Sequence, residues 1–172
     1  MQLSTRIVMT GAAFAALAGP AAAQSIDLTV TIPRLSVAEY HRPYVAIWLE
    51  KTGAPAKTLA VWYDHDMRDN EGTKWLRDVR QWWRASGRGL SFPADGITGA
   101  TKAPGTHKVS FGADALGGAM TPGDYTLLVE AAREVGGREL VKLPFRWPPK
   151  PGQTASAAGS TELGAVSATF KR

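Results

Sequence analysis

Apolar and polar residues alternate along several segments of the chain, the pattern of β-strands that bury one face. The segment 25–32, SIDLTVTI, places its isoleucine, leucine and valine side chains on one face and its aspartate and threonines on the other. The segments 43–51, PYVAIWLEK, and 57–64, KTLAVWYD, are apolar runs separated by the turn signal TGAP. A hairpin is therefore predicted for this pair, and three strands are expected before residue 65.

Strand patterns resume in the second half of the chain. They cover 106–111, 124–135, 138–147 and 162–170, with turn-rich stretches such as GADALGGAMTPG between them. The Pro/Gly/Ser/Ala stretch 148–160 is interpreted as a mobile loop. Seven strands are predicted in all.

The segment 73–84, TKWLRDVRQWWR, has a different periodicity. Its large apolar residues fall at positions 75, 76, 79, 82 and 83, the spacing of one helical face. Thr73 is a candidate N-cap, and Gly87 is placed to end the helix. One amphipathic helix is therefore predicted, with its apolar face packed on a sheet.

Strands without an alternating strand–helix rhythm favour an antiparallel β-sandwich. The segment 103–131, APGTHKVSFGADALGGAMTPGDYTLLVEA, resembles the immunoglobulin-like domain of flagellar hook-capping proteins. The predicted fold is mainly β: an immunoglobulin-like sandwich of about seven strands, residues 24–172, with the helix and a glycine-rich loop inserted at 73–105.

Residues 1–23 have the features of a secretory signal peptide. Arg6 precedes an apolar run that is too short to span a bilayer, and Ala21 and Ala23 form an A-x-A cleavage pattern. We expect cleavage after Ala23, a periplasmic location and no stable membrane insertion. Cysteine is absent, which excludes disulfides, thiol nucleophiles and thiolate metal sites.

The chain is mildly basic, with 20 Lys and Arg against 15 Asp and Glu. Removal of the leader leaves a net charge of about +4, which favours an anionic ligand or surface. The basic residues are dispersed and the chain is exported, so nucleic acid is not expected as a partner.

The stretch DGITGAT, residues 95–101, carries the most specific candidate chemistry. Its fixed positions are Asp95, Thr98, Gly99, Ala100 and Thr101. They resemble the D-x-x-[ST]-G-A-[ST] sequence recognised by periplasmic flavin transferases of the ApbE type. That resemblance implies FMN transferred from FAD onto the last hydroxyl, here Thr101, as a phosphoester. The alternative is a tight turn in which Thr98 or Thr101 caps the backbone and Gly99 takes a positive φ angle.

A resemblance to one family covers nearly the whole mature chain. It rests on RPYVAIWLE, KTLAVWYD, KWLRDVRQWW, DGITGATKAPG, GDYTLLVEAAREVGG and ELGAV. Together these segments are similar to the DUF2271 family of predicted periplasmic proteins. The family name implies no activity, so function is argued from the residues.

A tethered flavin needs ring and phosphate contacts. The aromatic candidates are Trp75, Trp82 and Trp83 of the helix and Trp48, Trp62 and Tyr63 of the strands. Most of these side chains are expected in the core, with Trp82 as the exception. The cationic candidates for the phosphate are Arg80, Arg84, Arg88 and Lys102, although a solvated basic face explains them equally well.

Other candidate chemistry is weaker. His65 lies between two aspartates, but adjacent residues seldom converge on one ion, and His41 and His107 are isolated in sequence. No motif of a serine hydrolase, phosphate-binding loop or zinc protease is present. Arg133 and Glu134 are expected to form surface ion pairs with Arg138 or Glu139.

Three functions follow from these observations. The first is a periplasmic electron carrier with FMN on Thr101, served by a flavin transferase and a membrane reductase of the PepSY type. The second is a non-catalytic periplasmic sandwich that binds a ligand or protein, with the TGAT loop as a structural turn. The third is a metal carrier that uses the three histidines. A carrier or binding protein is favoured over a stand-alone enzyme.

Overall fold

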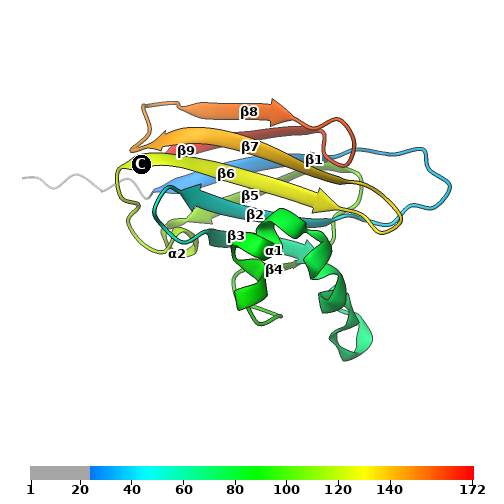
Figure 1. Cartoon of the computed structure of the whole chain (residues 1–172). Coiled ribbons are helices and arrows are strands. Elements are labelled where there is room, and N and C mark those ends of the chain that lie inside the picture. Colours follow the sequence, from blue (N-terminus) through cyan, green and yellow to red (C-terminus); the bar gives the residue numbers. More distant parts are fainter. Residues whose placement is uncertain (1–23) are drawn as a thin grey trace, which may run out of the picture.

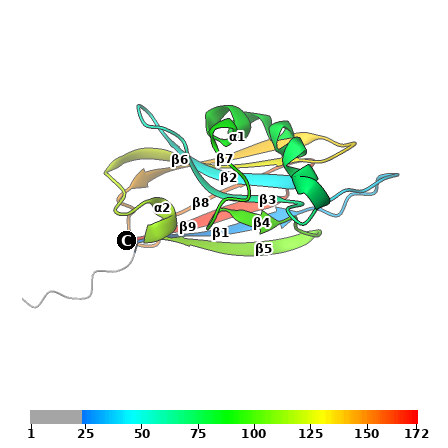
Figure 2. The ribbon, with the colours of Figure 1, turned by 90° about the horizontal axis from the view of Figure 1, so that it is seen from below.

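The computed structural model describes residues 24–172, so the predicted signal peptide lies outside the described residues. Two β-sheets pack face to face (Figures 1 and 2). The four-stranded sheet has the order β5-β1-β9-β8, and the five-stranded sheet has the order β4-β3-β2-β6-β7. The strands are β1 Ser25–Ile32, β2 Tyr44–Lys51, β3 Lys57–Tyr63, β4 Thr98–Ala100, β5 Gly105–Gly112, β6 Gly123–Ala132, β7 Arg138–Trp147, β8 Thr154–Ala158 and β9 Ala165–Lys171.

The main core lies between the two sheets. β1 supplies the alternating side chains that its sequence pattern predicts, β9 adds more from the same sheet, and β2, β6 and β7 supply the facing ones from the five-stranded sheet. Phe145 of β7 and Phe170 of β9 stack with ring centroids 4.0 Å apart, which joins the two layers directly. Every pairing except that of β3 with β4 is antiparallel, so the predicted sandwich and the β2–β3 hairpin are confirmed.

The five-stranded sheet is buried on its outer face as well. A helical segment covers this face (Figure 2) and encloses a second core. This core contains Tyr44, Ala46, Trp48, Val61, Tyr63, Leu76, Val79, Trp82, Leu128 and Ala132. The continuous apolar runs of β2 and β3 therefore reflect burial on both faces of the sheet.

The predicted single helix is interrupted. It consists of a 3₁₀ segment η1, Arg68–Asp78, then α1, Arg80–Ala85, and a short turn η2, Gly87–Gly89. The interruption falls at Val79, whose ψ of 71° is not helical. Thr73 lies inside η1 rather than at its start, and its hydroxyl donates to the carbonyl of Asn70. The chain bends at Val79 so that Leu76, Val79 and Trp82 all reach the sheet.

Two strands were not predicted. β4 lies within the glycine-rich loop, and β8 lies within the Pro/Gly/Ser/Ala stretch 148–160. The interpretation of this whole stretch as a mobile loop is therefore wrong. β8 pairs with β9 over its full length, from Thr154 opposite Thr169 to Ala158 opposite Ala165. Both are short edge strands with small side chains, so neither carries a strong apolar pattern. A short helix, α2 Ala113–Leu116, also occupies part of the expected turn after β5.

A buried carboxylate fastens the helical segment to the sheet. Glu130 of β6 is fully buried. It accepts hydrogen bonds from the backbone N–H groups of Gln81 and Trp82, at 3.0 and 2.8 Å, and from Arg138 Nη1 at 2.7 Å. Trp82 is fixed a second time, since its indole N–H donates to Thr58 Oγ1 at 2.9 Å. These bonds place α1 on the sheet in one orientation.

We predict that Glu130→Gln lowers the free energy of unfolding by about 2–4 kcal/mol, because an amide nitrogen would replace one acceptor oxygen facing three donors. Urea denaturation would measure the loss. Asp124→Asn is the control, because Asp124 pairs with Arg146 at 3.9 Å on an exposed surface. It is expected to change stability by less than about 0.5 kcal/mol. Equal effects of the two substitutions would contradict the anchoring role of Glu130.

A second carboxylate orders the loop before β9. Glu139 of β7 accepts hydrogen bonds from the backbone N–H groups of Ser160, Thr161 and Leu163 and from the Ser160 hydroxyl. Burial alone would raise the pKa of Glu139, but these donors outweigh it and lower the pKa from 4.5 to about 2.

A depressed pKa of this kind makes stability depend on pH. The carboxylate of Glu139 contributes stability above its unfolded pKa of 4.5, and this contribution is lost as pH falls through the folded value of about 2. We predict that Glu139→Gln destabilises the protein at pH 7 and makes its stability fall less steeply than that of the wild type between these two pH values. Urea titrations across this range would test it, and parallel curves for the two proteins would refute it.

Candidate functional site

A cavity of about 530 Å³ lies where the ends of several elements meet. The β1–β2 loop and the β6–β7 turn project at the same end of the sandwich in both views (Figures 1 and 2). Residues of both line the cavity, together with η1, the start of β2 and the residues just after β3 and β4. Its volume is within the range of small-molecule sites. Thr101, the last residue of the DGITGAT stretch, is one of the lining residues.

The motif folds as a turn followed by an edge strand. The Ala94 carbonyl accepts from the N–H groups of Ile97 and Thr98, and the Ala94 N–H donates to Thr98 Oγ1 at 2.9 Å. The positive φ angle, 71°, belongs to Gly96 and not to Gly99, which corrects the predicted turn geometry. From Thr98 the chain runs parallel to β3, with Gly99 opposite Trp62.

The β4 register brings Thr101 next to Asp64. Ala100 lies opposite Tyr63, so the next residues along the two strands are Thr101 and Asp64. Thr101 Oγ1 donates to Asp64 Oδ1 at 3.0 Å. A glycine-rich loop of this kind is expected at the protein surface. The structure corrects this expectation for Thr101, which is only 7 % exposed. Burial, together with the Asp64 carboxylate, raises the pKa of the neighbouring Tyr44 to about 12, so this phenol is neutral.

The other motif residues and the neighbouring Lys102 lie in different environments. Asp95 is exposed in the turn. A Cβ at Gly99 would lie 3.0 Å from Trp62 Cδ1, so close packing against Trp62 accounts for the absence of a side chain there. Lys102 lies 5.4 Å above the Trp62 ring and does not line the cavity. The motif residues are thus not gathered around one point, and Thr101 alone reaches the cavity.

The aromatic lining differs from the expectation. Trp82 is fully buried beneath α1, so the prediction that it is the exposed exception is wrong. Trp48, Trp62 and Tyr63 are buried as well. Trp75 is the exposed tryptophan of the helical segment, at 42 %, and it lines the cavity with the equally exposed Met67. The break at Val79 explains this, because the helical spacing does not continue across it: Leu76 of η1 packs on the sheet, and the adjacent Trp75 remains exposed.

The cationic lining also comes from unexpected residues. Arg80, Arg84 and Arg88 do not line the cavity, whereas Arg42 and Arg133 do. The guanidinium of Arg133 pairs with Glu162 through two hydrogen bonds of 2.9 and 3.1 Å, and both side chains are almost completely buried. The surface pairs expected for Arg133 are therefore incorrect. The sequence offers only a weak sign of this buried pair: Arg133 directly follows the apolar strand β6, and its partner Glu162 lies far along the chain.

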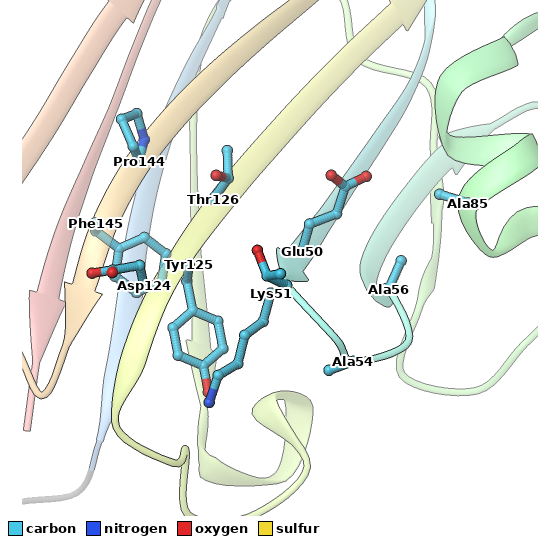
Figure 3. A pocket seen from close by; sticks show the side chains of 11 residues that line it. Glu50, Lys51, Ala54, Ala56, Ala85, Asp124, Tyr125, Thr126, Pro144 and Phe145 are labelled. Carbon is cyan, nitrogen blue, oxygen red and sulfur yellow. The ribbon is translucent and has the colours of Figure 1, made fainter.

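A second cavity, of about 640 Å³, lies at the other end of β2 and β6 (Figure 3). Its charged side chains already have partners within the protein. Lys51 Nζ donates to Thr121 Oγ1 and to the Pro122 carbonyl, and Glu50 accepts from the Trp48 indole. The polar groups of this cavity therefore do not call for a ligand, in contrast to those around Thr101.

The three histidines have local partners. His41 lines the Thr101 cavity and contacts Glu39 at 2.7 Å, His65 contacts Asp66 at 2.9 Å, and His107 contacts the Ala103 carbonyl at 2.8 Å. Within residues 24–172, no group of three or more histidine and acidic side chains is placed to hold a metal ion.

Comparison with known proteins identifies a family. The model of a family described as predicted periplasmic proteins, DUF2271, matches residues 25–165. No curated protein and no solved structure matches the chain. In the part of the chain that the structure describes, no helix is long and apolar enough to cross a membrane. The chain therefore belongs to the DUF2271 family of predicted periplasmic proteins, in agreement with the expected periplasmic location.

Proposed function

We propose that this protein is a periplasmic electron carrier that holds FMN covalently on Thr101 through a phosphoester bond. The observation that carries the proposal is the position of Thr101. The hydroxyl at the last position of a sequence resembling a flavin-transferase acceptor lines a cavity of ligand size. A threonine that served only a turn would not need to reach such a cavity.

The chemistry of the lining fits a flavin phosphate. Among residues 24–172, two buried side-chain polar atoms lack a hydrogen-bond partner, Tyr40 Oη and Arg133 Nη1, and both residues line the cavity. Both atoms are donors suited to phosphate oxygens. The exposed side chains of Trp75 and Met67 offer an apolar surface to a planar ring.

The chain's own residues would prepare the acceptor. Asp64 accepts a hydrogen bond from the Thr101 hydroxyl, so it orients Oγ1. The same carboxylate is in place to take up the hydroxyl proton during the transfer. In the transfer, the Thr101 Oγ–phosphorus bond forms as the pyrophosphate bond of FAD breaks and AMP leaves. The bound flavin then supplies the electron-transfer chemistry. Thr101 keeps it in the periplasm whatever its affinity for the cavity.

The partners of this function are a flavin transferase and a membrane reductase of the PepSY type. The transferase has to reach a threonine that is buried when β4 is paired. β4 has three residues and pairs with β3 alone at the sheet edge. We therefore expect modification before β4 pairs with β3, or during its transient release.

The intact mass of the protein purified from its own host tests the proposal. We predict a gain of about 438 Da over the chain cleaved after Ala23, the mass of one FMN joined by a phosphoester. The gain should be absent in Thr101→Ala and retained in Thr98→Ala. Thr101→Ala loses one hydrogen bond to an exposed carboxylate, so it should still fold, at a cost of about 0.5–1.5 kcal/mol.

Circular dichroism and urea denaturation would verify the folding of both variants. An unmodified wild-type mass from cells that flavinylate other proteins would refute the proposal and favour the binding module. Loss of the mass gain in Thr98→Ala together with its retention in Thr101→Ala would move the attachment site to Thr98.

A further inference from the structure

The end of the Thr101 cavity formed by Arg133 and Tyr40 contains polar groups whose hydrogen-bonding capacity is unused. Arg133 Nε and Nη2 bind Glu162, but Nη1 has no partner, although the side chain is only 6 % exposed. Tyr40 Oη is also buried without a partner. A buried donor without an acceptor destabilises the folded protein. Two of them beside one cavity are a cost that a ligand would remove.

The surrounding backbone is shaped to keep Arg133 in this position. The β6–β7 turn closes with hydrogen bonds between Arg133 and Gly137 and between Gly136 and Arg133. A side chain at Gly136 would overlap the Arg133 guanidinium. Val135, between them, has a φ of 52°, which is costly for a β-branched residue. The turn therefore accepts backbone strain while enclosing the arginine.

The electrostatic surroundings of Tyr40 favour an anion. Burial raises the pKa of Tyr40 and the Glu162 carboxylate acts in the same direction, whereas the charges of Arg133, Arg42 and Arg34 lower it. The phenol is therefore a neutral donor near three cations and one carboxylate, and that carboxylate is already paired with Arg133. Two of the three carboxylates that line the cavity have partners, since Asp64 accepts from Thr101 and Glu134 lies 3.6 Å from His41. The third, Asp78, belongs to η1.

We propose that Arg133 Nη1, Tyr40 Oη and Arg42 form a binding site for the oxyanion of a phosphate ester. Both unpartnered atoms are covered by the protein. The proposal therefore requires the β1–β2 loop, which carries Tyr40 and Arg42, to shift so that a phosphate can reach them. The inference rests on the proposed function only for the identity of its natural ligand, the phosphate of FMN. The site itself is a property of the unmodified chain.

Binding of inorganic phosphate to the unmodified protein, made without a transferase and verified by mass, tests the site. We predict saturable binding by calorimetry at low ionic strength. Tyr40→Phe should weaken it about 5- to 10-fold, the equivalent of one lost hydrogen bond. Without phosphate, the same variant should be as stable as the wild type or more stable, because it removes a buried hydroxyl that has no partner. Arg42→Gln should also weaken binding, and it removes a charge without touching the core.

Tyr125→Phe is the matched control. Its hydroxyl donates to the Thr121 carbonyl in the distant cavity, so this variant should bind phosphate as the wild type does. Absence of saturable binding, or equal affinity in the Tyr40→Phe variant, would overturn the inference. A Tyr40→Phe variant destabilised without phosphate would also overturn it, because the hydroxyl would then have a structural partner.

Free FMN and riboflavin distinguish recognition of the phosphate from recognition of the ring. FMN should bind more tightly than riboflavin, and Tyr40→Phe should reduce this difference; equal binding of the two would overturn the phosphate site. Phosphate binding without the FMN mass gain would leave this inference standing and refute the proposed function. The FMN mass gain without phosphate binding would support the proposed function and refute this inference.

Discussion

The arrangement of this protein depends on the fully buried carboxylate of Glu130. A charge without partners at that position would be strongly unfavourable, so the strand and the helical segment are stable only when they are joined. The backbone N–H groups at the start of α1 and the Arg138 guanidinium provide the partners. This fixes α1 on the sheet and places residues of the preceding segment, η1, beside the start of β2 and the end of β6. The wall of the Thr101 cavity that carries Trp75 and Met67 follows from this connection.

The strands could be predicted where burial leaves a regular pattern. β1 is buried on one face and alternates strictly, and β7 has the bounds that its sequence predicts. The pattern fails for β4 and β8, because short edge strands of small residues are held by backbone pairing that leaves no apolar period. The pattern also fails at Val79, where the spacing predicts a continuous helix. The helix is interrupted there, and α1 is held on the sheet by its hydrogen bonds to Glu130.

The candidate site was only partly accessible to sequence reasoning. The motif identifies Thr101 as a candidate site residue, because its residues are contiguous in the sequence and need no knowledge of the fold. Arg133, Glu162 and Tyr40 come from three separate segments, so their meeting depends on the β-sheet register and the β1–β2 loop. The cations nearest to the motif in sequence do not line the cavity. Lys102 lies over the ring of Trp62, whose side chain belongs to the core between the sheets, and Arg80 and Arg84 belong to α1. The same register instead brings Asp64 to Thr101.

Thr101 is buried, whereas its proposed modification requires that another enzyme reach its hydroxyl. The position of Thr101 in the topology allows both. A hydroxyl on a central strand would be inaccessible to another enzyme without global unfolding. Thr101 directly follows β4, a strand of three residues that pairs with β3 alone. Such an edge strand can open at a much lower free energy than a strand in the core. Once the strand has paired, the proposed attachment point lies in the cavity that Tyr40 and Arg133 also line. The strand would thus be open to the transferase before it closes around the cofactor.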